Sequence, residues 1–272
     1  MPELPEVETV KRKLEDIYLG KEIKNVEVRY EKILANIKTK DFINNLINQK
    51  IVSFSRKGKY LIINLSNSHL LVHLRMEGKF KDDIKELDKH SHIIFYFTDG
   101  SILIYHDVRK FGKIFYFGLD EDFYNLKPLN VLGKDAIDNI DIDYLYQKIK
   151  KDSRKIKTVL LDQSVLAGIG NIYADEILFD CKINPTKIAK KLNKTDCKNI
   201  IDSASKILNE AIKDGGSTIK SFKSFHGIDG MFQQHLQVYG RQGEPCPRCN
   251  TLIVKEFVNQ RGTHYCPKCQ KG

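Results

Sequence analysis

Four cysteines near the end of the chain constrain its fold more than any other feature. Cys246, Cys249, Cys266 and Cys269 follow the pattern C-x2-C-x16-C-x2-C, a spacing typical of zinc sites. Each pair presents two thiolates from a tight turn, and two such turns complete a tetrahedral set of sulfur ligands. Because protein fills all four positions, the metal would be structural. We predict one structural Zn2+ in a hairpin over residues 241–272, with a pair of disulfides as the alternative.

The charge of the chain indicates an anionic partner. Lys and Arg number 45 against 35 Asp and Glu, a formal net charge of +10, which favours nucleic acid or an anionic membrane surface. No apolar run approaches the ~20 residues that span a bilayer, and no basic-then-apolar leader opens the chain. A cytosolic protein is predicted, in which Cys181 and Cys197 are ordinary core thiols.

Residues 1–125 have the pattern of one helix followed by short strands. Turn residues such as Glu77-Gly78 and Asp99-Gly100 separate the apolar runs, which favours an antiparallel sandwich or barrel. The predicted strands are Ile51–Phe54, Tyr60–Leu65, His69–Leu74, His92–Phe97, Ser101–Tyr105 and Lys113–Phe117.

Residues 126–240 change to helical spacing, so the fold class is α+β. A loop is predicted over residues 226–240, where periodicity is lost, and three domains follow: 1–125, 126–240 and 241–272. The predicted helices are Asp141–Lys151, Lys157–Asp162, Asn171–Asp180 and Thr195–Lys213.

The start of the chain carries a candidate nucleophile. Removal of the initiator methionine would leave a secondary amine on Pro2, directly before Glu3. Such an amine attacks an aldehyde carbon to form an iminium, and its ordinary pKa of about 8 leaves part of it neutral at pH 7. A helix beginning near Pro5 would aim its positive dipole end at this amine and lower its pKa further. The alternative is that both prolines only mark a helix start.

Turns between the predicted strands carry candidate ligand-contacting residues. Lys59 lies in a basic hairpin turn, either as a solvated lysine or as a contact to phosphate or sugar. Met76 and Phe111 are apolar residues at turn tips, near Arg109. Proteins that extract a base use such wedges to fill the vacated stack, with an arginine for the orphaned partner. Packing against a neighbouring loop is the alternative.

Two further residues are candidates for phosphate contacts. Asn171 follows Gly-Ile-Gly at a predicted helix start, where helical N–H groups hold phosphates, although an ordinary N-cap is equally consistent. Arg261 lies between the cysteine pairs, at the predicted tip of the zinc hairpin. From there it would enter a minor groove or bind phosphates, or simply be exposed.

Taken together, these segments resemble bacterial formamidopyrimidine-DNA glycosylase. The resemblance extends over nearly the whole chain, from residue 2 to residue 271. It rests on the motifs M-P-E-L-P-E-V-E-T-V, R-K-G-K-Y-L, H-L-R-M-E-G, D-V-R-K-F-G, L-A-G-I-G-N-I-Y-A-D-E, Q-V-Y-G-R-Q-G-E-P-C and R-G-T-H-Y-C-P-K-C. It implies an N-terminal helix with a β-sandwich, a helix–two-turn–helix module and a zinc hairpin. The implied protein is a monomer of the bacterial cytosol that excises oxidised purines from double-stranded DNA and cuts the abasic site.

The resemblance also implies roles for individual residues. Pro2 would be the nucleophile and Glu3 the acid that helps open the sugar ring, with Lys59 and Arg261 completing the catalytic set. The segment Ser217–Tyr239 resembles the loop that covers the extruded base. The implied DNA contacts are His73, Met76, His92, Arg109, Phe111, Lys157 and Asn171.

One residue departs from the family pattern, and three rival functions stay open. Arg75 stands where the family usually has a small residue, so it adds a cation beside Met76. The nearest rival is the sibling endonuclease VIII, which removes oxidised pyrimidines. A non-catalytic protein that binds damaged DNA is the second, and a zinc-ribbon RNA-binding or ribosome-associated protein is the third; the latter leaves the N-terminal motif unexplained.

Overall fold

A computed structural model of the chain describes residues 1–217 and 230–271. The chain forms two compact units. Unit 1 comprises residues 1–129 together with 215–230, and unit 2 comprises residues 130–214 and 231–272. The segment predicted as a middle domain, 126–240, is therefore divided between the units, because Gly215–Gly230 groups with the N-terminal residues.

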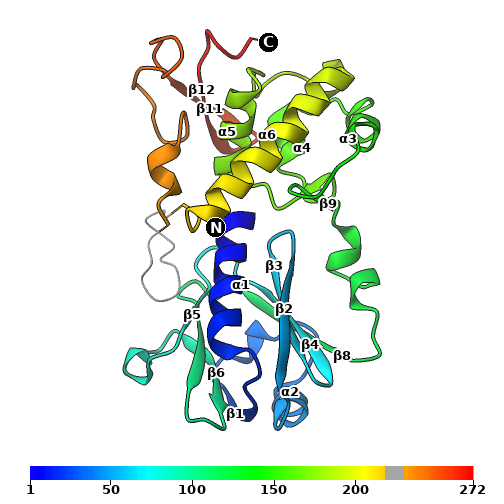
Figure 1. The fold of residues 1–272 in the computed structure, drawn as a ribbon, viewed down its shortest axis with the longest axis vertical. Coiled ribbons are helices and arrows are strands. Elements are labelled where there is room, and N and C mark those ends of the chain that lie inside the picture. Colours follow the sequence, from blue (N-terminus) through cyan, green and yellow to red (C-terminus); the bar gives the residue numbers. More distant parts are fainter. Residues whose placement is uncertain (218–229, 272) are drawn as a thin grey trace. The chain divides into compact units, whose positions relative to one another are not determined.

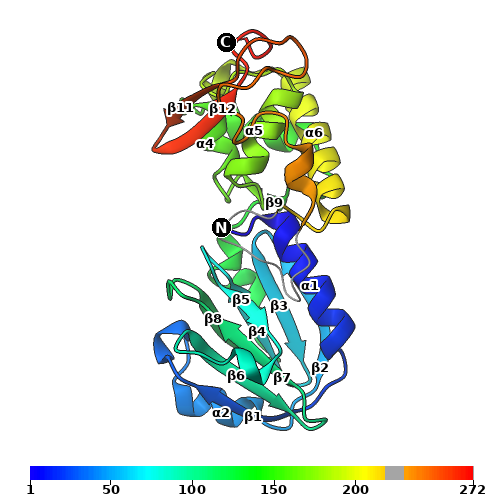
Figure 2. The same ribbon diagram turned by 90° about the vertical axis from the view of Figure 1, so that its left-hand side faces the viewer.

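Unit 1 contains two four-stranded antiparallel sheets, as Figure 2 shows. The order of the first sheet is β2 (Ile51–Lys57), β3 (Tyr60–Leu65), β4 (Ser68–His73) and β8 (Lys113–Gly118). The order of the second is β1 (Ile23–Val28), β6 (Ser91–Phe97), β7 (Ile102–His106) and β5 (Lys79–Lys81). The antiparallel sandwich predicted from the short apolar runs is confirmed.

Helix α1 (Leu4–Tyr18) packs along strands β2 and β3 (Figure 1). Its apolar residues Val7, Val10 and Leu14 recur at helical spacing and are at most 2% exposed in the core of unit 1. Helix α2 (Thr39–Leu46) packs against β1. Because only Phe42 and Leu46 of this short helix are buried, its sequence carries too weak a periodicity to predict it.

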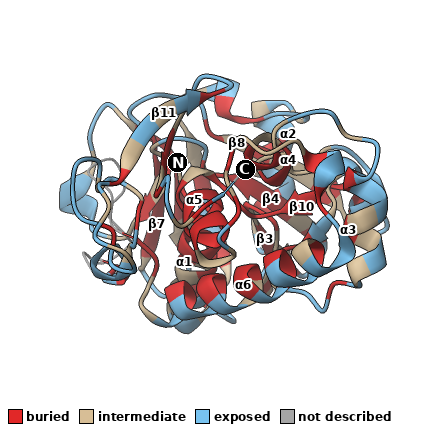
Figure 3. Ribbon diagram, turned by 90° about the horizontal axis from the view of Figure 1, so that it is seen from above, coloured by how far each residue is buried: buried red, intermediate tan, exposed pale blue. Residues whose placement is uncertain are grey.

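Unit 2 is built around helix α5. Figure 3 shows its ribbon almost entirely buried, consistent with burial of every residue from Ile172 to Phe179. It packs against α4, α6 and strand β12, and strands β11 and β12 form the predicted hairpin. The elements are α3 (Ile142–Ile149), α4 (Ile156–Leu160), α5 (Asn171–Asp180), α6 (Lys194–Lys213), β9 (Lys134–Asp135), β10 (Leu166–Ala167), β11 (Val254–Val258) and β12 (Arg261–Tyr265).

Short 3-10 turns complete the described structure. They are Glu31–Ile33, Ile84–Glu86, Phe123–Asn125, Leu129–Val131, Ala189–Lys191 and Phe232–His235. The last of these lies within the predicted loop 226–240, of which residues 226–229 are outside the described part of the chain. No helix among the described residues is long and apolar enough to cross a membrane.

A buried glutamate fixes the last part of this loop. The Glu176 carboxylate of α5 accepts hydrogen bonds from the backbone N–H groups of Gln237, Val238 and Tyr239 at 2.8–3.0 Å. Burial raises the pKa of Glu176, and the three backbone donors oppose that effect. The three N–H groups replace the water that the buried carboxylate has lost. Polar contacts therefore hold a segment that lacks apolar periodicity.

Candidate functional site

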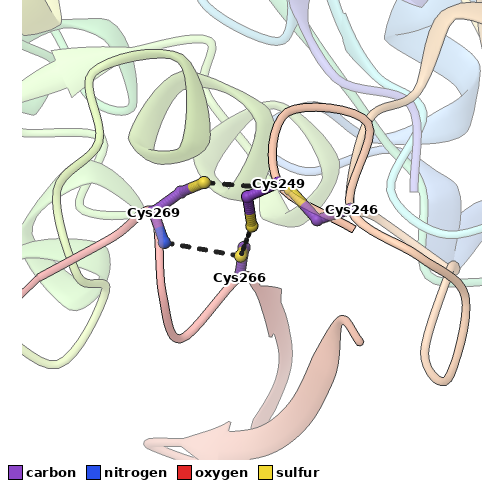
Figure 4. A group of neighbouring side chains, drawn as sticks. All are labelled: Cys246, Cys249, Cys266 and Cys269. Carbon is purple, nitrogen blue, oxygen red and sulfur yellow. Dashed lines mark hydrogen bonds between the residues drawn. The ribbon is translucent and has the colours of Figure 1, made fainter. Parts of the chain in front are cut away.

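The four predicted metal ligands lie together at one end of the zinc hairpin (Figure 4). Their sulfur atoms all lie within 4.8 Å of one another. The Sγ atoms of Cys246 and Cys269 are 3.9 Å apart, and those of Cys249 and Cys266 are 3.5 Å apart. A tetrahedral site with Zn–S bonds of about 2.3 Å needs S···S separations of about 3.8 Å. The residues therefore fit one structural Zn2+, and all the cysteines are free of disulfides.

The zinc knuckles are attached to helix α5. Cys246 and Cys266 are buried against Phe179, which also contacts Val238 and Ile253. Arg248, between the first two cysteines, lies over the Phe179 ring at 4.2 Å and pairs with Asp180 at 3.0 Å. The apolar environment of the knuckles comes from the cysteines themselves and from Phe179, Val238 and Ile253.

The candidate nucleophile lies in a buried segment that Glu6 holds. Pro2 is buried, Glu3 is 3% exposed, and Glu3 is the N-cap of α1. The Glu6 carboxylate, itself 4% exposed, accepts the Glu3 backbone N–H through Oε2 at 2.8 Å. Its Oε1 accepts the backbone N–H of Ser217 at 2.8 Å and the Ser217 hydroxyl at 3.1 Å. Glu6 thus joins the start of the chain to Ser217, which lies in the second segment of unit 1.

Lys59 is also buried, and its charge acts on the amine at the start of the chain. It lies in the two-residue turn between Lys57 and Tyr60, where Gly58 has φ of 55° as tight hairpins require. Lys59 is only 5% exposed, so the alternative of a solvated turn lysine is wrong. The pKa of the Met1 amine is lowered, mainly by burial and further by the charge of Lys59, while Glu3 and Glu6 oppose this. An amine at this end of the chain is therefore shifted toward its neutral, nucleophilic form.

Met76 lies in a turn that is hydrogen-bonded to the buried side chain of His73. Met76 is 36% exposed, whereas His73 is 7% exposed and accepts the Arg75 backbone N–H at Nδ1 over 3.0 Å. This bond helps hold Arg75 at φ of 54°, in the left-handed region. The Nδ1 atom of His73 therefore has its hydrogen-bond partner within unit 1. The added cation Arg75 is part of the turn that presents Met76.

Arg109 and Phe111 lie in a second turn, which Asp107 organises. Asp107 is fully buried and accepts the backbone N–H groups of Arg109 at 3.0 Å and Gly112 at 2.8 Å. The Arg109 guanidinium lies 5.0 Å from the Phe111 ring, which is 52% exposed. His92 is 2% exposed, and its Nε2 lies 2.7 Å from the Asp107 backbone oxygen. His92 supports this turn as His73 supports the other.

Tyr105 brings the two turns together. A Cβ atom on Gly78 would lie 2.5 Å from the Tyr105 hydroxyl, and one on Gly112 would lie 1.6 Å from it. Both turns thus approach the same fully buried ring, which only glycine permits. The structure places Met76 and Phe111 on turns that meet at one residue.

We expect Gly112→Ala to destabilise unit 1 by about 1–3 kcal/mol, because the new methyl group overlaps the Tyr105 hydroxyl. Urea unfolding measures this change. Adding Tyr105→Phe should recover part of the loss, since the next ring atom is 2.9 Å from that Cβ. Gly118→Ala is the control, because its Cβ would meet only a Glu121 oxygen at 3.5 Å. Equal effects of the two alanine variants would contradict the packing.

His73 should make stability depend on pH. Burial, together with the charges of Arg75 and Lys59, lowers its pKa to about 3. The unfolded chain, with a histidine pKa near ~6.5, then binds the extra proton first as pH falls, so stability declines below that value. Between pH 7 and pH 5 this removes about 2 kcal/mol of the free energy of unfolding. Urea titrations of wild type and His73→Asn test it, since asparagine keeps an acceptor without titrating. Identical pH profiles would refute the assignment.

The tip of the zinc hairpin presents Arg261. Asn259 and Gln260 form a two-residue turn with φ of 45° and 62°, as a type I′ hairpin requires. Arg261 is exposed and begins β12. The Asn259 side-chain amide donates to the Thr158 hydroxyl of α4 at 3.0 Å, which anchors the tip.

Asn171 and Lys157 both point to this hairpin. Gly170 is the N-cap of α5, so the alternative that Asn171 caps the helix is wrong. The Asn171 side-chain amide instead donates to the Gly262 carbonyl oxygen at 3.0 Å. Lys157 is fully buried, and its Nζ lies 2.7 Å from the carboxylate of Asp175.

Sequence reasoning overlooked three groups that support these residues, Asp175, Asp107 and Tyr105. Asp175 had a usable signal, since it and Glu176 lie between the apolar runs Ile172–Ala174 and Ile177–Phe179, and an acid buried among apolar residues requires a partner. Asp107 and Tyr105 carried no such signal in the sequence, because their roles depend on which turns meet in the folded unit.

Three family models match consecutive parts of the chain. Residues 1–114 match the formamidopyrimidine-DNA glycosylase N-terminal domain, and residues 132–223 match the formamidopyrimidine-DNA glycosylase H2TH domain. Residues 243–272 match the zinc finger found in FPG and IleRS.

Full-length relatives and solved structures agree with these matches. Formamidopyrimidine-DNA glycosylase from Bacillus cereus is 44% identical, with 99% of each chain covered. The Bacillus licheniformis protein of the same name is 46% identical over the whole of both chains. The Lactococcus lactis Fpg in complex with DNA containing an abasic site superposes with a TM-score of 0.90 at 39% identity, covering 99% of this chain and all of the other. A second complex of the L. lactis Fpg, with DNA containing Fapy-dG, gives a TM-score of 0.91 at 39% identity, again covering 99% of this chain and all of the other.

The fold and the site define a zinc-finger H2TH protein whose β-sandwich carries a buried N-terminal segment with an amine and carboxylates. Proteins of this class are DNA glycosylases of base excision repair. The chain belongs to the formamidopyrimidine-DNA glycosylase family, whose members remove oxidised purines and typically act as lyases at the abasic site. The resemblance and the enzyme class predicted from the sequence are confirmed.

Proposed function

We propose that this protein excises 8-oxoguanine and formamidopyrimidines from double-stranded DNA and then cuts the abasic site by β- and δ-elimination through Pro2. The observation that carries the proposal is the buried segment Pro2–Glu3 near the buried Lys59, at an end of the chain where burial lowers the pKa of the Met1 amine. The chemistry needs Pro2 as a free amine, so Met1 must have been removed.

The proposed reaction begins once the damaged nucleotide is turned out of the duplex, which requires a few kcal/mol. The Pro2 nitrogen uses its lone pair to form a bond to C1′ as the glycosidic bond breaks. The base leaves with the electrons of the glycosidic bond and takes up a proton, while the Pro2 nitrogen releases its own N–H proton and regains a lone pair. The C1′–O4′ bond then breaks, O4′ takes a proton from Glu3, and an iminium joins Pro2 to C1′.

The iminium accounts for both strand cuts. It makes the C2′ protons acidic, so loss of one expels the 3′ phosphate by β-elimination. Loss of the C4′ proton from the resulting conjugated iminium then expels the 5′ phosphate by δ-elimination. Water finally hydrolyses the iminium and returns Pro2 as an amine. Lys59 and Arg261 are proposed to bind the sugar and its phosphates and to support the eliminations. Zn2+ supports the hairpin and takes no part in bond breaking.

The turns of unit 1 suit the proposed filling of the vacated base stack. Met76 and Phe111 are the exposed apolar tips, and Arg109 lies over Phe111. We propose that His73 and His92 act by supporting these turns rather than by touching DNA. Asn171 would lie close to a phosphate held at Arg261.

The proposed partner is double-stranded damaged DNA, as in the solved complexes of the L. lactis Fpg. One chain supplies every proposed catalytic group, so the protein is proposed to act as a monomer. The bacterial origin of its relatives supports an assignment to the bacterial cytosol.

Borohydride trapping on an 8-oxoguanine:cytosine duplex, followed by peptide mass mapping, tests the proposal. We expect a DNA adduct on an N-terminal peptide that begins at Pro2. An adduct on Lys59 would keep the enzyme class and replace the nucleophile. Tight binding without an adduct, in a sample shown to lack Met1, would overturn the lyase and favour a binding protein.

Substrate comparison separates the purine enzyme from its sibling. The same protein is incubated with duplexes carrying 8-oxoguanine opposite cytosine or thymine glycol. Faster release of 8-oxoguanine supports the proposal, whereas faster release of thymine glycol would assign an endonuclease VIII-type activity.

A further inference from the structure

Lys157 is enclosed by polar partners within unit 2. Its side chain, on α4, is 0% exposed, and so is that of Asp175 on α5. Lys157 Nζ lies 2.7 Å from one carboxylate oxygen of Asp175. It also donates to the Gly262 carbonyl oxygen at 3.0 Å and to the Thr263 hydroxyl at 2.9 Å. Two helices and strand β12 therefore meet at this one ammonium group.

This environment does not suit a direct contact to phosphate. A phosphate contact needs an exposed cation that releases counterions from DNA. The ammonium of Lys157 is already surrounded by acceptors, and a buried lysine without them would lose much solvation energy. The charge of Lys157 is paired inside the protein with Asp175, and its ammonium group also donates to Gly262 and Thr263 of the hairpin.

The same hairpin has anchors on both sides of Arg261. On the turn side, the Asn259 amide donates to Thr158 at 3.0 Å. On the strand side, the second carboxylate oxygen of Asp175 accepts the His264 backbone N–H at 2.8 Å. Arg261 thus stands at the end of a strand whose next residues are fixed to α4 and α5, while its own side chain is exposed.

We propose that Lys157 is a positioning residue that acts through Arg261. With Asp175, it holds Gly262 and Thr263 so that the Arg261 guanidinium is presented in one place to the phosphates of the abasic site. The inference rests on the proposed function, and it replaces the direct DNA contact that the resemblance implied for Lys157.

The first test uses the full-length zinc-loaded protein without DNA. Hydrogen exchange at the Gly262 to His264 amides is compared in wild type, Lys157→Met and the double variant Lys157→Met/Asp175→Asn. The double variant avoids leaving a buried carboxylate without its counterion, so it stays informative if the single variant unfolds. Lys151→Met, which removes an exposed lysine a few residues away, is the control.

We expect these amides to exchange roughly tenfold or more faster in the Lys157 variants and unchanged in Lys151→Met, because local opening is set by the contacts that hold the segment. Unchanged protection in the folded double variant would overturn the proposal. This readout requires no activity, so it stands apart from the outcome of the proposed function.

The second test measures the ratio of δ- to β-elimination products on an abasic duplex. Arg261→Ala serves as the reference, and Lys157→Met should reduce the ratio in the same direction by about tenfold to a hundredfold, as misplacement of a catalytic group does. Combining the two changes should add almost nothing, because both remove one function. Multiplied losses would show an independent phosphate contact by Lys157 and refute the positioning role. A wild type that leaves abasic DNA uncut would instead refute the proposed function.

Discussion

Replacing Pro2 with glycine is expected to slow 8-oxoguanine removal by at least about a hundredfold, or roughly 2.7 kcal/mol of transition-state stabilisation. Glycine keeps an amine but loses the ring that makes the nitrogen secondary and fixes its backbone angle. Single-turnover release of the base measures the effect. The affinity for a duplex with an uncleavable abasic analogue should change little, because the DNA contacts proposed for Met76, Arg109 and Phe111 are untouched.

The matched control is Pro5→Gly, which weakens the first turn of the same helix without changing the terminal nitrogen. It should lower stability and leave the chemical step nearly intact. If Pro2→Gly releases the base at the wild-type rate, the nucleophile lies elsewhere, and Lys59 becomes the next candidate because it is buried in the same surroundings.

Loss of one zinc ligand is the second large effect that we expect. Cys246→Ser should abolish zinc retention and weaken binding of damaged duplex by at least about a hundredfold. The knuckles have little apolar core besides the metal site, Phe179, Val238 and Ile253, and structural zinc supplies about 10–16 kcal/mol to comparable small sites. Zinc content, hydrogen exchange over β11 and β12, and a binding titration check this together.

Cys181→Ser is the control for that experiment, since Cys181 is a free cysteine outside the cluster. It should keep its zinc and bind as the wild type does. Full affinity in a chelated protein whose zinc content has fallen to zero would contradict the expected dependence of DNA binding on the metal.

Elements with strong local signals could be predicted from the sequence. Helix α5 spans Asn171–Asp180 as predicted, because glycines precede it and apolar residues flank its two central acids. Helix α6 begins one residue earlier than predicted, at Lys194, where Asn193 accepts the backbone N–H of Asp196 as a cap. Strand β1 was not predicted, since its burial follows no strict alternation.

The roles of the charged residues could not be predicted in the same way. Met76, Arg109 and Phe111 were assigned from their turn positions, and the structure does place them on turns. Nothing in the sequence around Lys157 distinguishes it from an exposed lysine. Its partner Asp175 lies on another helix and meets it only in the folded unit. Burial of a charge depends on a partner from another element, which local periodicity does not encode.

The contact between Glu6 and Ser217 joins residues 211 positions apart in the chain. Its consequence concerns the timing of synthesis. A nascent chain carries Glu6 and one donor, the Glu3 N–H, from the start, but the two donors of Ser217 are made much later. A fragment ending at residue 129 would contain both sheets and still lack part of unit 1. The N-terminal segment, although made first, is therefore completed only after most of the chain has been synthesised.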